Sequence, residues 1–193
     1  MKNNIMKIFS ISPREIIGKS VNSAGAEELK EYFEGLKNII LTGKFIGNDQ
    51  DATPSVGKGM CSKVPWVAIH FKSVKISSPD VRIGYLFNLS KRKAVLALMC
   101  GTHNEINEPL DRQETIRMRK DVQVKLDNYH DGYFKKNSDV VSEASAGTGV
   151  SKNYDVAVCY YKLYDPNFLP DDAVLKDDLH KMCVLYRKYW EIK

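Results

Sequence analysis

The sequence predicts an α+β fold in which one mixed, strongly bent or barrel-like sheet is flanked by N-terminal and C-terminal helices. Three observations predict it: an amphipathic helical pattern near the N-terminus, several short β-branched and aromatic runs in the middle, and a long helical pattern at the C-terminus. The chain has 193 residues, 43% hydrophobic and 27% charged, which is enough to form one packed core. Because no repeat or linker divides it, we expect one domain over residues 1–193.

The first predicted helix covers Ala26 to Leu41. Its apolar residues recur at a spacing near 3.6: Leu29, Phe33, Leu36, Ile39 and Ile40. Acidic residues lie in its first turn, where the helix dipole favours them, and Gly43 is a plausible stop. The stretch from Gly43 to Lys63 is polar and rich in glycine, so we expect a loop there.

Three strands are expected next, over Val64 to Phe71, Val81 to Leu89 and Ala94 to Gly101. The last two are separated by Ser90-Lys91-Arg92-Lys93, which is short and polar enough for a hairpin. A fourth β-branched and aromatic run, Asn153 to Tyr164, is expected to join the same sheet.

Two further helices are expected, over Arg112 to Leu126 and after Pro170. The second has an apolar stripe at i, i+4, i+7, i+11 and i+14, formed by Leu175, Leu179, Met182, Tyr186 and Tyr189. Asp171 and Asp172 lie at its start. Between these helices, residues 127–153 include a small-residue stretch with Gly147 and Gly149, which predicts a long flexible loop.

The cysteines and the apolar runs indicate a cytoplasmic protein. Four cysteines, Cys61, Cys100, Cys159 and Cys183, lie far apart and form no CxxC pair, so they are expected to be small buried hydrophobic residues. The longest apolar runs are under about ten residues, against about 20 needed to cross a bilayer. The N-terminus is a poor signal peptide because a lysine interrupts its short apolar run. We therefore expect no membrane contact.

No complete catalytic motif is present. The chain lacks a Gly-Lys-Ser/Thr phosphate loop and a Gly-x-Ser-x-Gly elbow, and no expected strand has the paired carboxylates of a metal-dependent nuclease. We therefore expect no catalytic residues, no metal and no cofactor. A nuclease with unrecognised metal ligands remains an alternative.

The short sequence Val64-Pro65-Trp66 is the most informative local feature. Proline fixes the backbone, so the Trp66 indole is expected at a strand entrance, where a planar group can stack on it. The alternative is that Trp66 fills part of the core. The net charge of +5 favours a polyanionic partner.

Several blocks of the sequence also carry a family resemblance. They run from Gly57-Lys58-Gly59 through Val64-Pro65-Trp66-Val67-Ala68-Ile69, and include Ile83-Gly84-Tyr85-Leu86-Phe87, Val95-Leu96-Ala97-Leu98 to Gly101-Thr102, Tyr154 to Tyr164, and Leu169-Pro170-Asp171-Asp172 to Tyr186. Together they resemble the N-terminal domain family of McrB-like restriction proteins. That family's glycine loop commonly continues into an Asn-Trp-Ala type sequence, which Met60, Cys61 and Ser62 replace here.

The resemblance implies a DNA-recognition module of a modification-dependent restriction or phage-defence system, with methylated DNA as one expected ligand. It also implies an AAA+ GTPase motor or a nuclease subunit as a partner. On this hypothesis we expect phosphate contacts from basic residues near the strand ends: Lys58, Lys63, Arg82, Lys91, Arg92 and Lys93. A modified base would stack on Trp66, Tyr85 or Phe87, although the face shared by Tyr85 and Phe87 can equally be core.

A second function class stays open. A protein-interaction or sensor module would dock on a partner nuclease or motor through the aromatic end formed by Tyr186, Tyr189 and Trp190. Salt dependence separates the two hypotheses, because DNA affinity falls steeply with ionic strength and an apolar interface is nearly insensitive to it.

Overall fold

The structure is a computed structural model that describes residues 1–76, 78–104, 106, 108–137 and 141–193. Within these residues six strands form one sheet in the order β1-β2-β3-β4-β6-β5, and each neighbouring pair is antiparallel. The strands are β1 (Gln50–Lys58), β2 (Met60–Phe71), β3 (Arg82–Asn88), β4 (Lys93–Met99), β5 (Lys135–Lys136) and β6 (Val158–Tyr164). The sheet is open, with β1 and β5 at its edges.

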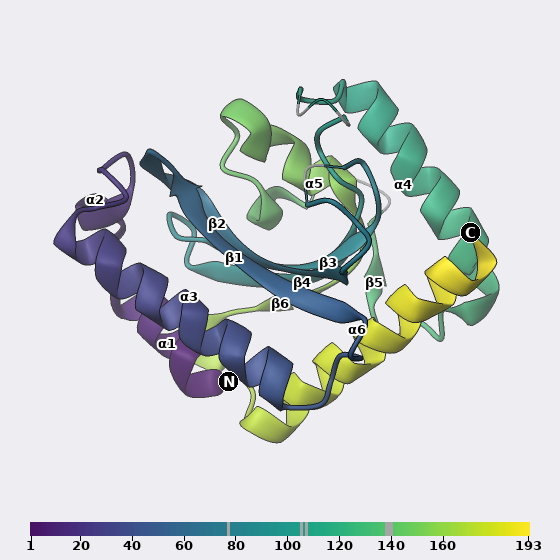
Figure 1. Cartoon of the computed structure of the whole chain (residues 1–193), viewed down its shortest axis with the longest axis horizontal. Helices are drawn as coiled ribbons and strands as arrows, with labels where there is room; N and C mark the ends of the chain where they lie inside the picture. Colours follow the sequence, from purple (N-terminus) through teal and green to yellow (C-terminus); the bar gives the residue numbers. More distant parts are fainter. Residues whose placement is uncertain (77, 105, 107, 138–140) are drawn as a thin grey trace.

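Helices flank the sheet at both ends of the chain, and Figure 1 shows how strongly the sheet curves between them. They are α1 (Lys2–Ser10), α2 (Pro13–Ile16), α3 (Ala24–Thr42), α4 (Arg112–Leu126), α5 (Tyr154–Ala157) and α6 (Asp172–Ile192). In the described part of the chain four 3-10 turns accompany them: η1 (Asp127–Tyr129), η2 (Ser142–Ala144), η3 (Gly149–Asn153) and η4 (Pro166–Phe168). The expected α+β fold with a bent sheet between terminal helices is confirmed.

Local sequence accounts for the three long helices. The apolar stripes of α3 and α6 are buried against the sheet, as the spacing predicted. Side-chain caps fix two of the starts, since the Asp111 carboxylate accepts from the Gln113 amide at 2.8 Å and that of Asp171 accepts from the Val174 amide at 3.0 Å. The helix α4 has the bounds that the sequence predicted.

Strand alternation gives the sheet two buried faces. Ile83, Tyr85 and Phe87 of β3 point to the first face, where α1, α3 and α6 complete the main core. Leu86 of β3 points to the second face, where it packs with Val95 and with residues from the segment 141–158. Figure 1 shows α3 and α6 on one side of the curved sheet and α5 on the other.

The loop expected over residues 43–63 is wrong for most of its length, because these residues form β1 and the start of β2. Backbone pairing with β2 stabilises β1 despite its polar composition, with Asp51 opposite His70 and Ser55 opposite Trp66. Gly57 makes the bulge in this hairpin possible, since its φ is +133° and a Cβ there would lie 2.1 Å from the Met60 carbonyl oxygen. An edge strand tolerates polar residues because one side of it faces solvent.

The strand expected over residues 153–164 begins only at Val158. Residues 154–157 form the single turn α5, which is held by side chains and not by sheet pairing. The flexible loop expected over residues 127–153 is also wrong in part, because it contains η1, β5, η2 and η3, and Ala144 is completely buried. Residues 138–140 of that prediction lie outside the described residues.

A buried carboxylate joins α6 to β6. Asp178 is fully buried and its oxygens accept from Tyr133 Oη at 2.5 Å, Lys162 Nζ at 2.6 Å and Tyr164 Oη at 2.8 Å. Burial combined with the neighbouring carboxylate raises the pKa of Tyr164, so its hydroxyl keeps the proton that it donates. Three donors thus compensate the one buried charge.

We predict that Asp178→Ala lowers the free energy of unfolding by about 3 kcal/mol or more, because it leaves the Tyr133 and Tyr164 hydroxyls without their acceptor and the Lys162 ammonium without its carboxylate. Urea denaturation followed by circular dichroism measures this. Asp177→Ala is the matched control: the Asp177 carboxylate is half exposed and pairs with Lys181 at the surface, so its loss costs less than about 0.5 kcal/mol. Equal effects of the two substitutions contradict the assignment.

Candidate functional site

A hollow of about 80 Å³ lies on the second face of the sheet. Its floor comes from β2, β3 and β4, and its rim from the residues after β4 and from α5. The lining residues with chemistry to offer are Trp66, Arg82, His103 and Tyr154, and the apolar ones include Ala68, Leu86 and Met99. Gly84 lies in the floor, where its missing side chain leaves room that Met99 borders. The hollow therefore combines an apolar floor with a polar and aromatic rim.

Trp66 is placed differently from the expectation. It lies in the middle of β2, opposite Ser55 on one side and Leu86 on the other, so the predicted position at a strand entrance is wrong. The reason is that β2 begins at Met60, four residues before the expected start at Val64. Its side chain is half buried and faces the hollow. The indole is thus carried by a strand that pairs with a neighbouring strand on each side.

Tyr154 stands against Trp66 across the hollow. Burial raises the pKa of the Tyr154 hydroxyl, whereas a hydrogen bond from the Trp66 side chain and the charge of Arg82 oppose that rise. Because an indole N–H can only donate, the Tyr154 oxygen is the acceptor.

Arg82 is a structural cation in this arrangement. Its guanidinium donates to the carbonyl oxygens of Ile76, Ser78 and Asp80, and only 8% of the residue is exposed. Gly101 lets this loop approach closely, since a Cβ there would lie 2.0 Å from the Ser78 oxygen. Its donors already serve the protein backbone, which argues against the phosphate contact expected from Arg82.

His103 adds a neutral polar group to the rim. Burial lowers the pKa of its imidazole, and the nearby positive charge of Arg82 lowers it further. Its Nδ1 lies 3.3 Å from Thr102 Oγ1. A neutral imidazole has one donor and one acceptor nitrogen, so it can read either kind of polar group on a ligand.

The other two expected aromatics belong to the core. Tyr85 and Phe87 are completely buried on the first face, where the Phe87 ring contacts Phe9 and Phe33. They lie on the opposite side of β3 from the hollow. Of the two alternatives that the sequence left open for this face, the structure shows the core.

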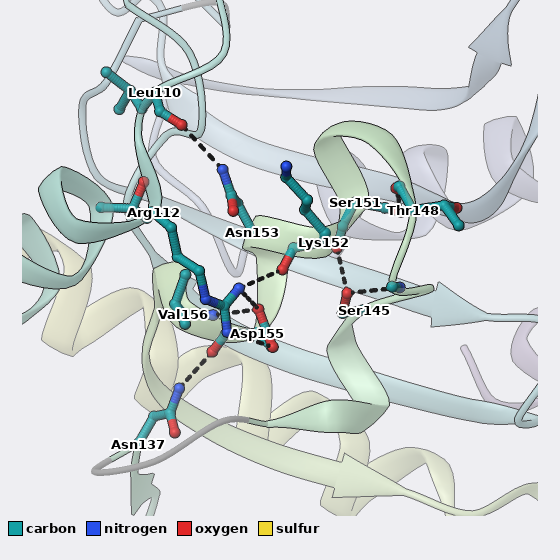
Figure 2. A network of polar contacts seen from close by, with 12 residues as sticks. Leu110, Arg112, Asn137, Ser145, Thr148, Ser151, Lys152, Asn153, Asp155 and Val156 are labelled. Carbon is teal, nitrogen blue, oxygen red and sulfur yellow. Dashed lines mark hydrogen bonds and ion pairs between the residues drawn. The ribbon is translucent and has the colours of Figure 1, made fainter.

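A network of polar contacts holds the wall that carries Tyr154 (Figure 2). Arg112, at the start of α4, donates from both terminal nitrogens to the buried Asp155 carboxylate at 3.2 Å, and also to the Lys152 carbonyl oxygen. Asn153 donates to the Leu110 carbonyl, and Asn137 to that of Asp155. Because these contacts come from the start of α4 and from the residue after β5, they fix α5, and Tyr154 within it, over the sheet.

The basic candidates divide into two groups. Lys93 forms an ion pair with Asp165, so part of its charge is already used. Lys58, Lys63, Lys91 and Arg92 are exposed at the end of the sheet where β2 begins and the β3–β4 hairpin turns. The Leu89 amide donates to the Lys63 carbonyl at 3.2 Å, which brings Lys63 beside that turn. The structure thus gathers charge at this end, away from Arg82.

The aromatic end proposed for a docking module is largely internal. Tyr186 and Tyr189 are buried, and Trp190 is half buried with its ring 5.6 Å from that of Phe71. These residues secure α6 on the sheet. Their burial removes the feature on which the docking hypothesis was based.

Several expected absences concern only the residues that the structure describes. Within them there is no group of three or more His, Cys, Asp or Glu side chains able to hold a metal ion. No helix in that part of the chain is long and apolar enough to cross a membrane. All four cysteines are buried thiols, as the sequence predicted.

Sequence reasoning missed Tyr154 and His103. Tyr154 opened an apparent strand, and only the contacts of Asp155 and Asn153 turn that stretch into a helical wall. His103 lay just after an expected strand, where no motif distinguishes it. The one usable signal was Asn153-Tyr154-Asp155 itself, because two residues that favour turns and caps flank the tyrosine.

Comparison with known families gave one finding. A family model described as "MrcB-like, N-terminal domain" matches residues 21–191 of the 193-residue chain. Searches of the curated proteins and of the solved structures gave no match.

We predict that Arg112→Ala disturbs the hollow from a distance, because Asp155 then loses its partner and α5 loosens. The readout is the indole N–H resonance of Trp66, which should shift, while that of Trp190 stays in place. Trp66→Phe assigns the two resonances. Arg117→Ala removes an exposed arginine from the same helix and serves as the control; equal shifts from both variants contradict the positioning role of Arg112.

We also predict that His103 titrates below 6.5, its ordinary pKa, in an NMR titration. Because the folded-state pKa is lowered, the unfolded chain takes up this proton first, and the free energy of unfolding falls as the pH drops through that range. Urea denaturation at about pH 7.5 and about pH 5.5 measures the change. His103→Gln should make the loss of stability smaller, and an unchanged pH dependence argues against a buried neutral imidazole.

Proposed function

The chain belongs to the MrcB-like N-terminal domain family, and we propose that it recognises modified DNA for a McrBC-type restriction or phage-defence system. The family supports the DNA-recognition role in such systems. The modified base is the finer part of the proposal. One observation carries it: the hollow between Trp66 and Tyr154, which offers an aromatic wall, an apolar floor and a neutral imidazole on one face of the sheet.

The dimensions of the hollow suggest how a base would be read. Its volume of about 80 Å³ is well below the roughly 150 Å³ of an engineered cavity that holds benzene. A whole base therefore does not fit inside it as it stands. We propose that a base taken out of the helix stacks on the exposed part of Trp66 and that its edge, with the modifying group, enters the hollow.

The apolar floor favours a small apolar modification. Ala68, Leu86 and Met99 would surround a methyl group there, and burial of one such carbon contributes about 0.8 kcal/mol, or about fourfold in affinity. Stacking of the base on an aromatic ring contributes about 1–3 kcal/mol. That amount is comparable with the few kcal/mol needed to unstack a base, so recognition depends on both contributions together with the phosphate contacts.

We propose that the chain recognises DNA without cutting it, as one unit over residues 1–193. Contacts between its two ends support the single unit, since the N-terminal amine pairs with Asp172 at 3.2 Å. Exposed Lys58, Lys63, Lys91 and Arg92 would contact phosphates. Cleavage would come from an AAA+ GTPase motor or a nuclease partner.

Binding to matched duplexes tests the proposal. Fluorescence anisotropy would compare duplexes that carry cytosine, 5-methylcytosine, 5-hydroxymethylcytosine or N6-methyladenine, each at two salt concentrations. A preference for one modified duplex that persists at the higher salt supports base reading. Binding without preference reduces the function to electrostatic attachment, and no binding to any duplex contradicts DNA recognition.

We predict that Trp66→Ala removes the preference between modified and unmodified duplexes and weakens binding to the preferred one by at least about fivefold, the equivalent of about 1 kcal/mol of stacking. Trp66→Phe should keep part of the preference because a ring remains. Phe168→Ala is the control, since Phe168 is 85% exposed in η4 and does not line the hollow. Circular dichroism confirms that each variant is folded, and an unaltered preference in Trp66→Ala excludes this hollow as the reading site.

A further inference from the structure

A second depression, of about 300 Å³, adjoins the wall that carries Tyr154. It lies where the start of β2, the β3–β4 hairpin and the segment around η2 meet. The residues used below that line it are Lys63, Ser90, Lys91, Ser142, Gly147 and Asp155. None of the motifs found in the sequence predicts that these segments meet.

The charge of this depression is positive. Lys63 is exposed and has no ion-pair partner in the described part of the chain. Lys91 donates from Nζ to the Ser142 carbonyl oxygen at 2.8 Å, an uncharged acceptor that leaves its charge uncompensated. Asp155 is the acidic residue among the described lining residues, and both of its oxygens are already bound by Arg112. Among the lining residues the two lysines therefore carry the uncompensated charge, while the Glu143 carboxylate lies beside Ser142 and is not one of them.

Polar donors accompany the two lysines. Ser90 is exposed and carries a hydroxyl. The Ser142 hydroxyl and the Gly147 amide lie at the same edge but already donate, to Glu143 Oε2 at 3.1 Å and to Ser145 Oγ at 3.0 Å respectively. Ammonium groups combined with hydroxyls and backbone amides are the usual ligands of a phosphate in protein–DNA contacts. The depression thus has the chemistry of a phosphodiester site.

The positive surface continues beyond Ser90. This serine also lines a neighbouring open depression together with Ser12, Pro13, Arg14 and Ile17. Arg14 is exposed, so Ser90 has Lys63 and Lys91 on one side and an arginine on the other. Sequence reasoning did not select Arg14, because it lies more than seventy-five positions before Ser90 in the hairpin turn. A strand of DNA following this surface would meet basic groups at successive phosphates.

Consecutive residues of α5 connect this site to the hollow. Tyr154 lines the hollow and Asp155 lines the depression, so the single helical turn α5 borders both cavities. We propose that the depression between Lys63 and Lys91 binds the DNA phosphate adjacent to the base that Tyr154 faces, and that Arg14 binds a neighbouring phosphate of the same strand. This inference rests on the proposed function and adds the position of the DNA backbone to it.

The double variant Lys63→Ala/Lys91→Ala tests the site. Loss of each phosphate contact reduces the slope of log affinity against log salt by about 0.9, and weakens binding by about fivefold at about 150 mM salt. Modified and unmodified duplexes should lose equally, because a phosphate contact does not read the base. Adding Arg14→Ala to the double variant should reduce the slope and the affinity by the amount of one further phosphate contact.

Lys72→Ala/Lys120→Ala is the matched control. Lys72 is exposed and, like Lys91, donates to a carbonyl oxygen, here that of Asn48, and Lys120 is an exposed lysine on α4. Neither lines the depression. The control should keep the slope and the affinity of the unmodified protein. If both double variants lose equally, general charge explains the result and the assigned site is wrong.

A single-phosphate replacement locates the contact. Duplexes with one neutral methylphosphonate at successive positions should show a loss of about fivefold for the unmodified protein at the position next to the modified base. For the Lys63→Ala/Lys91→Ala variant, the methylphosphonate at that position should cause no further loss of affinity. An equal loss in protein and variant overturns the assignment.

Inorganic phosphate separates failure of this site from failure of the proposed function. We expect added phosphate to shift the amide resonances of Ser90 and Gly147 in the unmodified protein and to leave them in place in the double variant. If these shifts occur and no duplex binds, the anion site stands and the DNA function fails. If duplexes bind and phosphate moves neither resonance in the protein, the site fails and the function stands.

Discussion

Burial of β3 on both faces is the constraint on which the rest of the structure depends. Every residue from Arg82 to Asn88 is buried, so each side of the central sheet needs a cover. The helices α1, α3 and α6 cover the first face, where a large apolar core forms. A much less regular segment, residues 141–158, covers part of the second face. Because this segment covers the second face only in part, the hollow beside Trp66 and the depression beside Lys63 remain open.

The buried charged residues Asp155, Asp178 and Arg82 each have several polar partners. The buried carboxylates of Asp155 and Asp178 are each matched by a cation, Arg112 and Lys162 respectively, and by further donors. Arg82 neutralises no carboxylate but satisfies three carbonyls in the loop before β3. These groups use charge to hold irregular segments in place, because such segments have few backbone partners of their own. The cations left at the surface are then available for a ligand.

The hollow at Trp66 and the depression at Lys63 therefore suit different parts of a ligand. One has an aromatic rim and an apolar floor, which suits a planar group, and the other has two lysines and hydroxyls, which suits a phosphate. Both depend on the position of α5, which Arg112 fixes through Asp155 (Figure 2). A site assembled on a strand and a clamped helical turn keeps its geometry before the ligand arrives, and this reduces the entropy lost on binding.

The sequence by itself determined the elements whose signal is local. The apolar periods of α3 and α6, the acidic caps of α4 and α6 and the β-branched runs of β3 and β4 all depend on neighbours a few residues away, and these elements appeared with nearly the expected bounds. The family resemblance came in part from the blocks in β3, β4 and α6, and it is confirmed. The overall α+β fold with its bent sheet was therefore predictable.

Tertiary structure alone decided the edge strand, the wall and the composition of the site. Gln50 to Lys58 became β1 because β2 offered hydrogen bonds, and residues 154–157 became a helical turn because Arg112, from a different helix, binds Asp155. Packing between distant segments likewise placed Trp66 beside Tyr154, buried Tyr85 and Phe87 in the core and brought Arg14 near Ser90. Partners of this kind lie tens of residues apart, so no local pattern can carry them.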